Sequence, residues 1–166
     1  MSARAIFQSA SLGSLVRYSD GRPRPPDRFA RKLAAWQNTN GSGMLIRKTP
    51  ARDLGRVTIP DAFTLHVGSY GSEGVVVLVV QRIYDVTSPL AFSVESSPRP
   101  GQVLVVAGSN AQPELKYLAA DLGEAEAWAS LKGYRDLRLV LVGEDDVPVP
   151  AGPASDLDVF EPSPAS

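Results

Sequence analysis

The sequence has 166 residues, of which 43% are hydrophobic and 21% are charged, and its formal net charge is −1. This length and composition are typical of one globular domain, and they exclude a chain that is disordered throughout. Because there is no cysteine, disulfides, iron–sulfur clusters, thiol nucleophiles and cysteine-ligated zinc are excluded, and a reducing compartment is favoured.

The first residues contain no apolar segment of signal-peptide length. The most hydrophobic run, residues 75–80, covers six residues, whereas a membrane-spanning helix needs about 20. We therefore expect a cytoplasmic protein with no membrane partner.

Charge is distributed unevenly along the chain. Residues 1–56 carry eleven Lys and Arg against three acids, whereas residues 57–166 carry six basic residues against fifteen acids. This asymmetry favours a polyanionic partner or electrostatic assembly between copies of the chain. The alternative is that both sets of charges are only solvated surface.

The first third predicts an extended arm followed by a helix. Residues 14–18 form a short strand pattern that ends in a turn at 19–21. Residues 22–26 are three prolines and two arginines, and proline fixes φ and removes a backbone donor, so we expect polyproline-like backbone here.

Residues 28–38 predict an amphipathic helix, with Asp27 as its N-cap. Phe29, Leu33 and Trp36 recur on one face at helical spacing. We expect these three side chains to be buried against a sheet.

The middle of the chain is dominated by strand patterns. Residues 44–48 predict a strand, and residues 49–55 predict one helical turn with a proline at its start. Alternating apolar residues predict strands at 63–67 and 90–94. The continuous apolar run within 75–84 predicts a strand covered on both faces, in the middle of the sheet.

The C-terminal part predicts a strand at 102–107, a helix at 113–131 and a buried strand at 137–142. The residues that define the apolar face of this helix are Leu115, Leu118, Leu122, Ala125 and Trp128. Strand, helix and strand in this order form a βαβ unit with a right-handed crossover. The expected fold class is therefore α+β, with a mixed, largely antiparallel sheet, one C-terminal βαβ unit and two main helices.

The chain divides into three parts on this interpretation. Residues 1–26 form a basic extended arm with a short strand, and residues 27–143 form a globular domain. Residues 144–166 carry six acids, no basic residue and five prolines, which predicts a disordered acidic tail. Within the tail, the apolar residues of 156–160 are spaced to dock on another surface.

Few residues offer catalytic chemistry. His66 is the only histidine, so a multi-histidine metal site is excluded, and any Ser-His-Asp arrangement must use this residue. A solvated strand residue is the favoured interpretation of it. The carboxylates Glu144, Asp145 and Asp146 follow a strand and could hold Mg²⁺, although a solvated acidic run is favoured. We expect no cofactor and no metal, and we lean away from an enzyme.

One loop lies where ligands bind in open α/β sheets. Gly108, Ser109 and Asn110 follow the strand at 102–107 and precede the predicted helix, and backbone N–H groups at such a point attract anions. Simple capping of the helix by Ser109 or Asn110 is the favoured alternative.

The basic residues of the first third are the better candidates for a binding site. Arginine gives bidentate contacts with phosphate or carboxylate groups, and an extended arm can follow a groove or a neighbouring subunit. The candidate residues are Arg17, Arg22, Arg24, Arg28, Arg31, Lys32, Arg47 and Lys48.

We therefore expect a non-enzymatic interaction or assembly protein whose basic arm and first helix engage an acidic partner. That partner is an acidic protein surface, on a neighbouring copy in a homo-oligomer, or a nucleic acid. One version is a structural component of a virion or a mobile-element complex. The alternatives are a small ligand-binding or enzymatic domain that uses the loop at 108–110, and a nucleic-acid-binding regulator.

Overall fold

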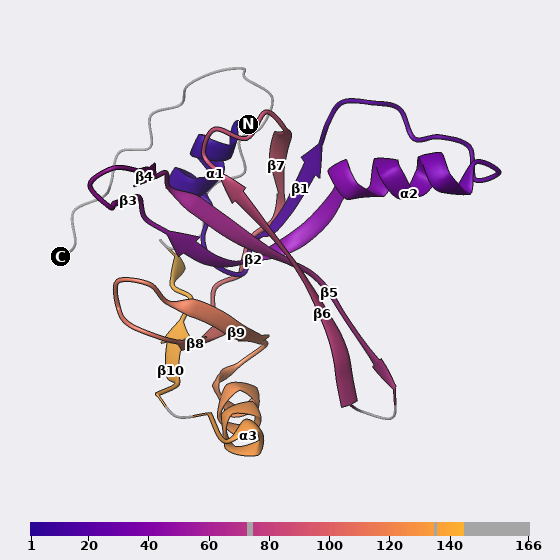
Figure 1. Ribbon diagram of the computed structural model, residues 1–166. Helices are drawn as coiled ribbons and strands as arrows, with labels where there is room; N and C mark the ends of the chain where they lie inside the picture. The colour runs from indigo at the N-terminus through magenta and orange to yellow at the C-terminus, as the bar shows by residue number, and fades with distance from the viewer. Residues whose placement is uncertain (73–74, 135, 145–166) are drawn as a thin grey trace.

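A computed structural model describes residues 1–72, 75–134 and 136–144 of the chain (Figure 1). Apart from Glu144, the predicted acidic tail and its docking segment at 156–160 lie outside the described residues.

Within these residues the chain forms three helices and ten strands. The helices are α1 (Ala3–Ser9), α2 (Ala30–Thr39) and α3 (Leu122–Lys132). The strands are β1 (Leu15–Ser19), β2 (Gly41–Thr49), β3 (Arg52–Asp53), β4 (Thr58–Ile59), β5 (Ala62–Ser72), β6 (Val75–Asp85), β7 (Ala91–Ser96), β8 (Val103–Ala107), β9 (Glu114–Ala119) and β10 (Arg138–Leu141).

Eight strands form one sheet in the order β10-β8-β9-β2-β1-β7, and β5 and β6 are added beside β2. All of the described strand pairs are antiparallel. The α+β fold with a largely antiparallel sheet is thus confirmed.

Strand β2 is the junction of this sheet. Met44 pairs with both β1 and β5, and Arg47 pairs with both β5 and β9. A strand has two edges, so β5 occupies one edge of β2, while β1 and β9 share the other edge in succession.

The predicted βαβ unit is wrong in its order and in its strand direction. The first part of the predicted helix at 113–131 forms β9, which pairs with β8, and β10 lies antiparallel to β8. The helix begins later because Asp121 accepts a hydrogen bond from the Glu124 N–H (2.9 Å), and Glu124 accepts one from the Ala120 N–H (2.6 Å). Asp121 is thus the N-cap of α3, and the Glu124 side chain accepts from the residue before the cap instead of from the cap itself, as it would in a capping box.

Two main clusters of apolar side chains form the core, and a smaller third one joins Ile46 of β2 to Val106 of β8 and Leu115 of β9. Helix α1 packs over β1, β2, β5 and β7, and its Ala3 and Ile6 are fully buried beside Leu45 and Phe63. Helix α3 covers β8 and β9, where Ala125 packs among the buried valines of β8. Burial of α1 also corrects the predicted arm, because part of residues 1–26 is helix and core instead of extended chain.

The apolar run of β6 lies at an edge of the sheet, not in its middle. Among the described strands, β6 pairs only with β5, and the two form a long hairpin that extends away from the body (Figure 1). Val76, Leu78, Val79 and Ile83 are exposed. The predicted burial of the last strand is also wrong, because β10 is an edge strand with Leu141 63% exposed.

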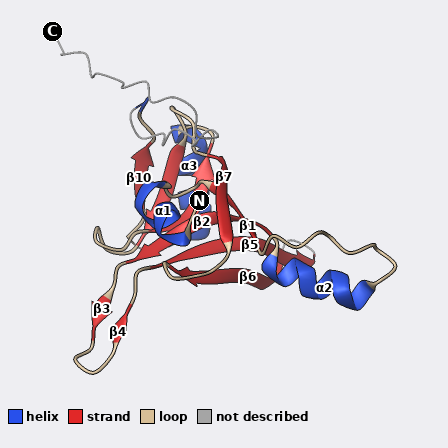
Figure 2. Cartoon of the chain, turned by 90° about the horizontal axis from the view of Figure 1, so that it is seen from above, coloured by secondary structure: helices blue, strands red, loops and turns tan. Residues whose placement is uncertain are grey.

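The first predicted helix is confirmed as α2, but the predicted burial of its apolar face is wrong. Helix α2 projects from the body in both views (Figures 1 and 2). It contains no buried residue; Leu33 and Trp36 are only partly buried, and Phe29 is 41% exposed. Because the helix projects from the body instead of lying on the sheet, its apolar face does not pack into the core.

The helical turn predicted at 49–55 is also absent. Instead, Arg52 and Asp53 of β3 pair with Thr58 and Ile59 of β4. Gly55, in the connection between them, has a φ of 81°, a left-handed conformation that glycine adopts without strain.

Candidate functional site

The clearest charged feature is a basic lobe, which we define as residues 20–40. It consists of an extended arm, residues 20–29, and helix α2. The lobe carries five basic side chains and two carboxylates, Asp20 and Asp27. The five basic residues are Arg22, Arg24, Arg28, Arg31 and Lys32.

A polar network around Asn40 anchors this lobe to the sheet. The buried Asn40 side chain donates to Asp20 Oδ1 (2.8 Å) and to the carbonyl of Trp36 (3.0 Å). Its Oδ1 accepts from Ser19 Oγ (2.6 Å), and Thr39 Oγ1 donates to Asp20 Oδ2 (2.8 Å). Hydrogen bonds lower the pKa of the Asp20 carboxyl. The one from Asn40 has the largest effect, followed by those from the Arg22 N–H and the Thr39 hydroxyl.

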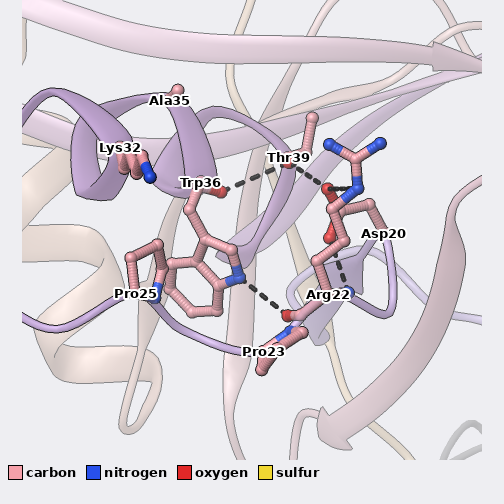
Figure 3. A pocket seen from close by; sticks show the side chains of 8 residues that line it. All are labelled: Asp20, Arg22, Pro23, Pro25, Lys32, Ala35, Trp36 and Thr39. Carbon is pink, nitrogen blue, oxygen red and sulfur yellow. Dashed lines mark hydrogen bonds and ion pairs between the residues drawn. The ribbon is translucent and has the colours of Figure 1, made fainter.

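The arm folds back on α2 and forms a groove with it (Figure 3). The indole N–H of Trp36 donates to the carbonyl of Arg22 (2.8 Å), and Pro23 and Pro25 lie beside the ring. The groove has a volume of about 340 Å³, and Lys32 also lines it. Because an aromatic ring and basic side chains meet here, the groove suits an anionic partner with some apolar surface.

Most cations of the lobe have a neighbour within the lobe but remain accessible. Arg24 pairs with Asp27 at 2.7 Å, and Arg22 lies 4.0 Å from Asp20. Arg28 and Lys32 lie 4.8 Å and 5.2 Å from the ring centroid of Phe29. Exposed ion pairs of this kind are weak, so a partner can replace them.

The structure does not gather the other three predicted cations on this lobe. Arg17 pairs with Glu95 at 3.7 Å on β7, and Arg47 pairs with Glu114 of β9. The ammonium of Lys48 lies 5.9 Å from the Phe7 ring, and burial lowers its pKa. These three residues contact the body of the protein and lie outside the basic lobe.

The loop at Gly108, Ser109 and Asn110 joins β8 to β9 instead of preceding a helix. The Arg138 side chain donates to the carbonyls of Gly108 (3.2 Å) and Ser109 (3.3 Å) and to Asn110 Oδ1. The helix N-terminus on which its anion-binding role was based is therefore absent from this place.

A larger hollow, which the sequence did not indicate, lies between the β5–β6 hairpin and the β9–α3 part of the chain. We call it the aromatic cleft; its volume is about 610 Å³. One wall contains Tyr117, Trp128 and Tyr134, whose rings are stacked, and the other contains His66 and Ser69. These residues come from positions too far apart for any local motif to reveal the cleft.

Among residues 1–72, 75–134 and 136–144, no group of three or more His, Cys, Asp or Glu side chains is placed to hold a metal ion. In the same part of the chain, no helix has the length and apolar content needed to cross a membrane.

The fold and these two features define a small α+β protein with an antiparallel sheet, a projecting basic lobe and an aromatic cleft. The family model described as "Uncharacterised conserved protein UCP036055" matches residues 1–146, and the chain belongs to this family. No curated protein and no solved structure matches the chain.

Proposed function

We propose that the protein is a non-enzymatic assembly subunit, in which the basic lobe of one copy binds an acidic lobe of the next. We define the acidic lobe as α3 together with β10 and the flanking residues, 120–144, which carry five acids against three basic residues. Its exposed carboxylates are Asp121, Glu124, Glu126, Asp136 and Glu144. The chain continues from this lobe into residues 145–166, which carry five more acids and no basic residue.

The observation that carries the proposal is the position of α2. An amphipathic basic helix without a buried residue projects from the body, whereas the carboxylates of the acidic lobe belong to a different part of the molecule (Figures 1 and 2). Because the basic lobe and the acidic lobe belong to different parts of one molecule, each can bind the opposite lobe of another molecule. Complementary charges of this kind select the partner and speed its association.

Exposed apolar side chains support the same function. Phe29 on the basic lobe and Leu131, Leu139 and Leu141 on the acidic lobe are all exposed. Large apolar residues gathered on a surface commonly mark interfaces. Contact between the two lobes would therefore bury apolar area as well as pair charges.

Contact between two different surfaces is heterologous. Such contacts close into rings or continue as open filaments, according to the rotation between neighbours. This geometry suits the expected role as a component of a larger particle. A subunit whose basic lobe binds the acidic lobe of the next subunit adds copies in one direction.

The test is a charge-reversal exchange followed by light scattering. The doubly substituted variant Arg28→Glu/Arg31→Glu and the variant Glu126→Lys/Glu144→Lys should each remain monomeric at low salt, where the unaltered protein associates. A mixture of the two variants should associate again, because each retains one unaltered lobe and the reversed lobes attract each other.

Salt provides a second readout, since screening weakens exposed charge pairs within a Debye length of about 10 Å at 0.1 M ionic strength. Association that disappears at high salt supports the proposal. A monomer at every salt concentration contradicts it. If labelled oligonucleotides bind instead, and alanine at Arg22, Arg24, Arg28 and Arg31 abolishes that binding, the partner is a nucleic acid.

A further inference from the structure

The aromatic cleft has one wall made of three parallel rings. Trp128 is stacked on both tyrosines. Its ring centroid lies 5.2 Å from that of Tyr117, with an interplanar angle of 3°, and 5.9 Å from that of Tyr134, with an interplanar angle of 11°. The Tyr117 hydroxyl donates to Glu124 of α3 (2.7 Å), which fixes the orientation of the first ring. Tyr134 is about half exposed, so the stack ends in a ring that solvent or a ligand can reach.

The opposite wall presents polar side chains from the β5–β6 hairpin. His66 Nε2 and Ser69 Oγ share a hydrogen bond of 2.9 Å. Residues three apart in a regular strand point to opposite faces, but the register of β5 shifts between His66 and Gly68. This bulge turns Ser69 to the same side as His66, and bulges often re-aim side chains beside functional sites.

Positive charge prevails inside the cleft. Lys116 and Lys132 line it, and its carboxylate, Glu114, accepts hydrogen bonds from Lys116 (2.6 Å) and from Arg47. Burial alone would raise the Glu114 pKa, but these two hydrogen bonds and the charges of Lys116 and Arg47 together outweigh it, and the pKa is lowered. Glu114 therefore stays ionised and is compensated, which leaves the charge of Lys132 in excess.

From this arrangement we infer that the cleft binds a small organic anion with a planar aromatic part. The volume of about 610 Å³ lies within the range of small-molecule sites, which combine apolar and aromatic walls with a few polar groups. The exposed ring of Tyr134, at the end of the stack, would contact the ring of the ligand. Lys132, with the His66–Ser69 pair, would contact its carboxylate or sulfonate group, because a charged acceptor strengthens such hydrogen bonds.

The test uses two fluorescent probes of similar shape. 8-Anilinonaphthalene-1-sulfonate carries the anion, and N-phenyl-1-naphthylamine is its neutral relative. We expect the sulfonate to bind with one molecule per chain and more tightly than the amine. Lys132→Met should weaken the sulfonate about tenfold or more, since a hydrogen bond to a charged group is stronger than one between neutral groups, and should leave the amine unchanged. Tyr134→Ala should weaken both.

Two controls keep the result specific. Ile83→Ser removes an exposed apolar side chain that does not line the cleft, and it should leave both affinities unchanged. All measurements are repeated in the Arg28→Glu/Arg31→Glu background, so that failure of the proposed assembly does not affect the outcome. Equal affinity for the two probes, loss of binding in Ile83→Ser, or no change in Lys132→Met would overturn the inference.

Discussion

The indole of Trp36 donates a hydrogen bond to the backbone carbonyl of Arg22 across 2.8 Å, and this contact joins the arm to α2 (Figure 3). The two residues are fourteen positions apart. The arm and the helix therefore form one unit, and the backbone of the arm is held beside the helix that carries Arg31 and Lys32.

Replacement of Trp36 by alanine should cost little global stability. The side chain is only partly buried, so we expect the free energy of unfolding to fall by about 1 kcal/mol, the typical net value of one hydrogen bond. The burial expected from the sequence would have given a loss of about 3–5 kcal/mol, as for large core aromatics. Urea unfolding measures this, with Phe63→Ala, at a fully buried position, as the control that should show the larger loss.

Acid should release the arm before it unfolds the body. The pKa of Asp20 is lowered in the folded protein, first by the hydrogen bond from Asn40. A lowered pKa contributes stability that is present above the ordinary pKa of aspartate and is lost as the pH falls through the folded value. In a Trp128→Phe background, Trp36 fluorescence should report this change. Asp20→Asn should remove the transition; an unaltered titration in that variant would contradict the assignment.

Tyr84 should make the protein sensitive to alkali. Burial, followed by the nearby Tyr18, raises the pKa of Tyr84 to about 12, so the folded state favours the neutral phenol. Its stabilising contribution is complete below the ordinary tyrosine pKa of about 10 and is lost as the pH rises towards 12. Its hydroxyl has no hydrogen-bond partner among the described residues. Tyr84→Phe should therefore leave stability at neutral pH nearly unchanged and move alkaline unfolding, measured by circular dichroism, to higher pH.

A charge on strand β6 should improve solubility without loss of stability. Leu78 is exposed on β6, which pairs with β5 and lies at an edge of the described sheet, and natural proteins use lysine on such edges to prevent edge-to-edge association. Leu78→Lys should reduce light scattering at high protein concentration, with a melting temperature close to that of the unaltered protein. A large fall in melting temperature would mean that Leu78 is buried in a contact within the folded chain.

Local patterns predicted the strands well and their surroundings poorly. The alternation of 63–67 and 90–94 identified β5 and β7, because one face of each contacts the core under α1. The apolar residues of β6 and β10 carry no information about their neighbours, so their edge positions could not be deduced. The spacing of Leu115, Leu118 and Leu122 fits a helix, but it runs across the junction between β9 and α3.

The two candidate sites differ in how far apart their residues lie in the sequence. The cations of the basic lobe are close together in the sequence, so composition alone located them, although it did not separate Arg17, Arg47 and Lys48 from the rest. The aromatic cleft unites His66 with Trp128. Only the pairing of β5 and β9 on opposite edges of β2 brings such distant residues to one hollow.

The position of β2 has a consequence for how the molecule unfolds. Its neighbouring residues Leu45 and Ile46 belong to different apolar clusters, one under α1 and one beside β8 and β9. A strand that melts must therefore release both clusters together. We expect a single cooperative transition for the whole sheet, with equally slow hydrogen exchange on the two sides of β2, and neither half of the chain should fold after separation from this strand.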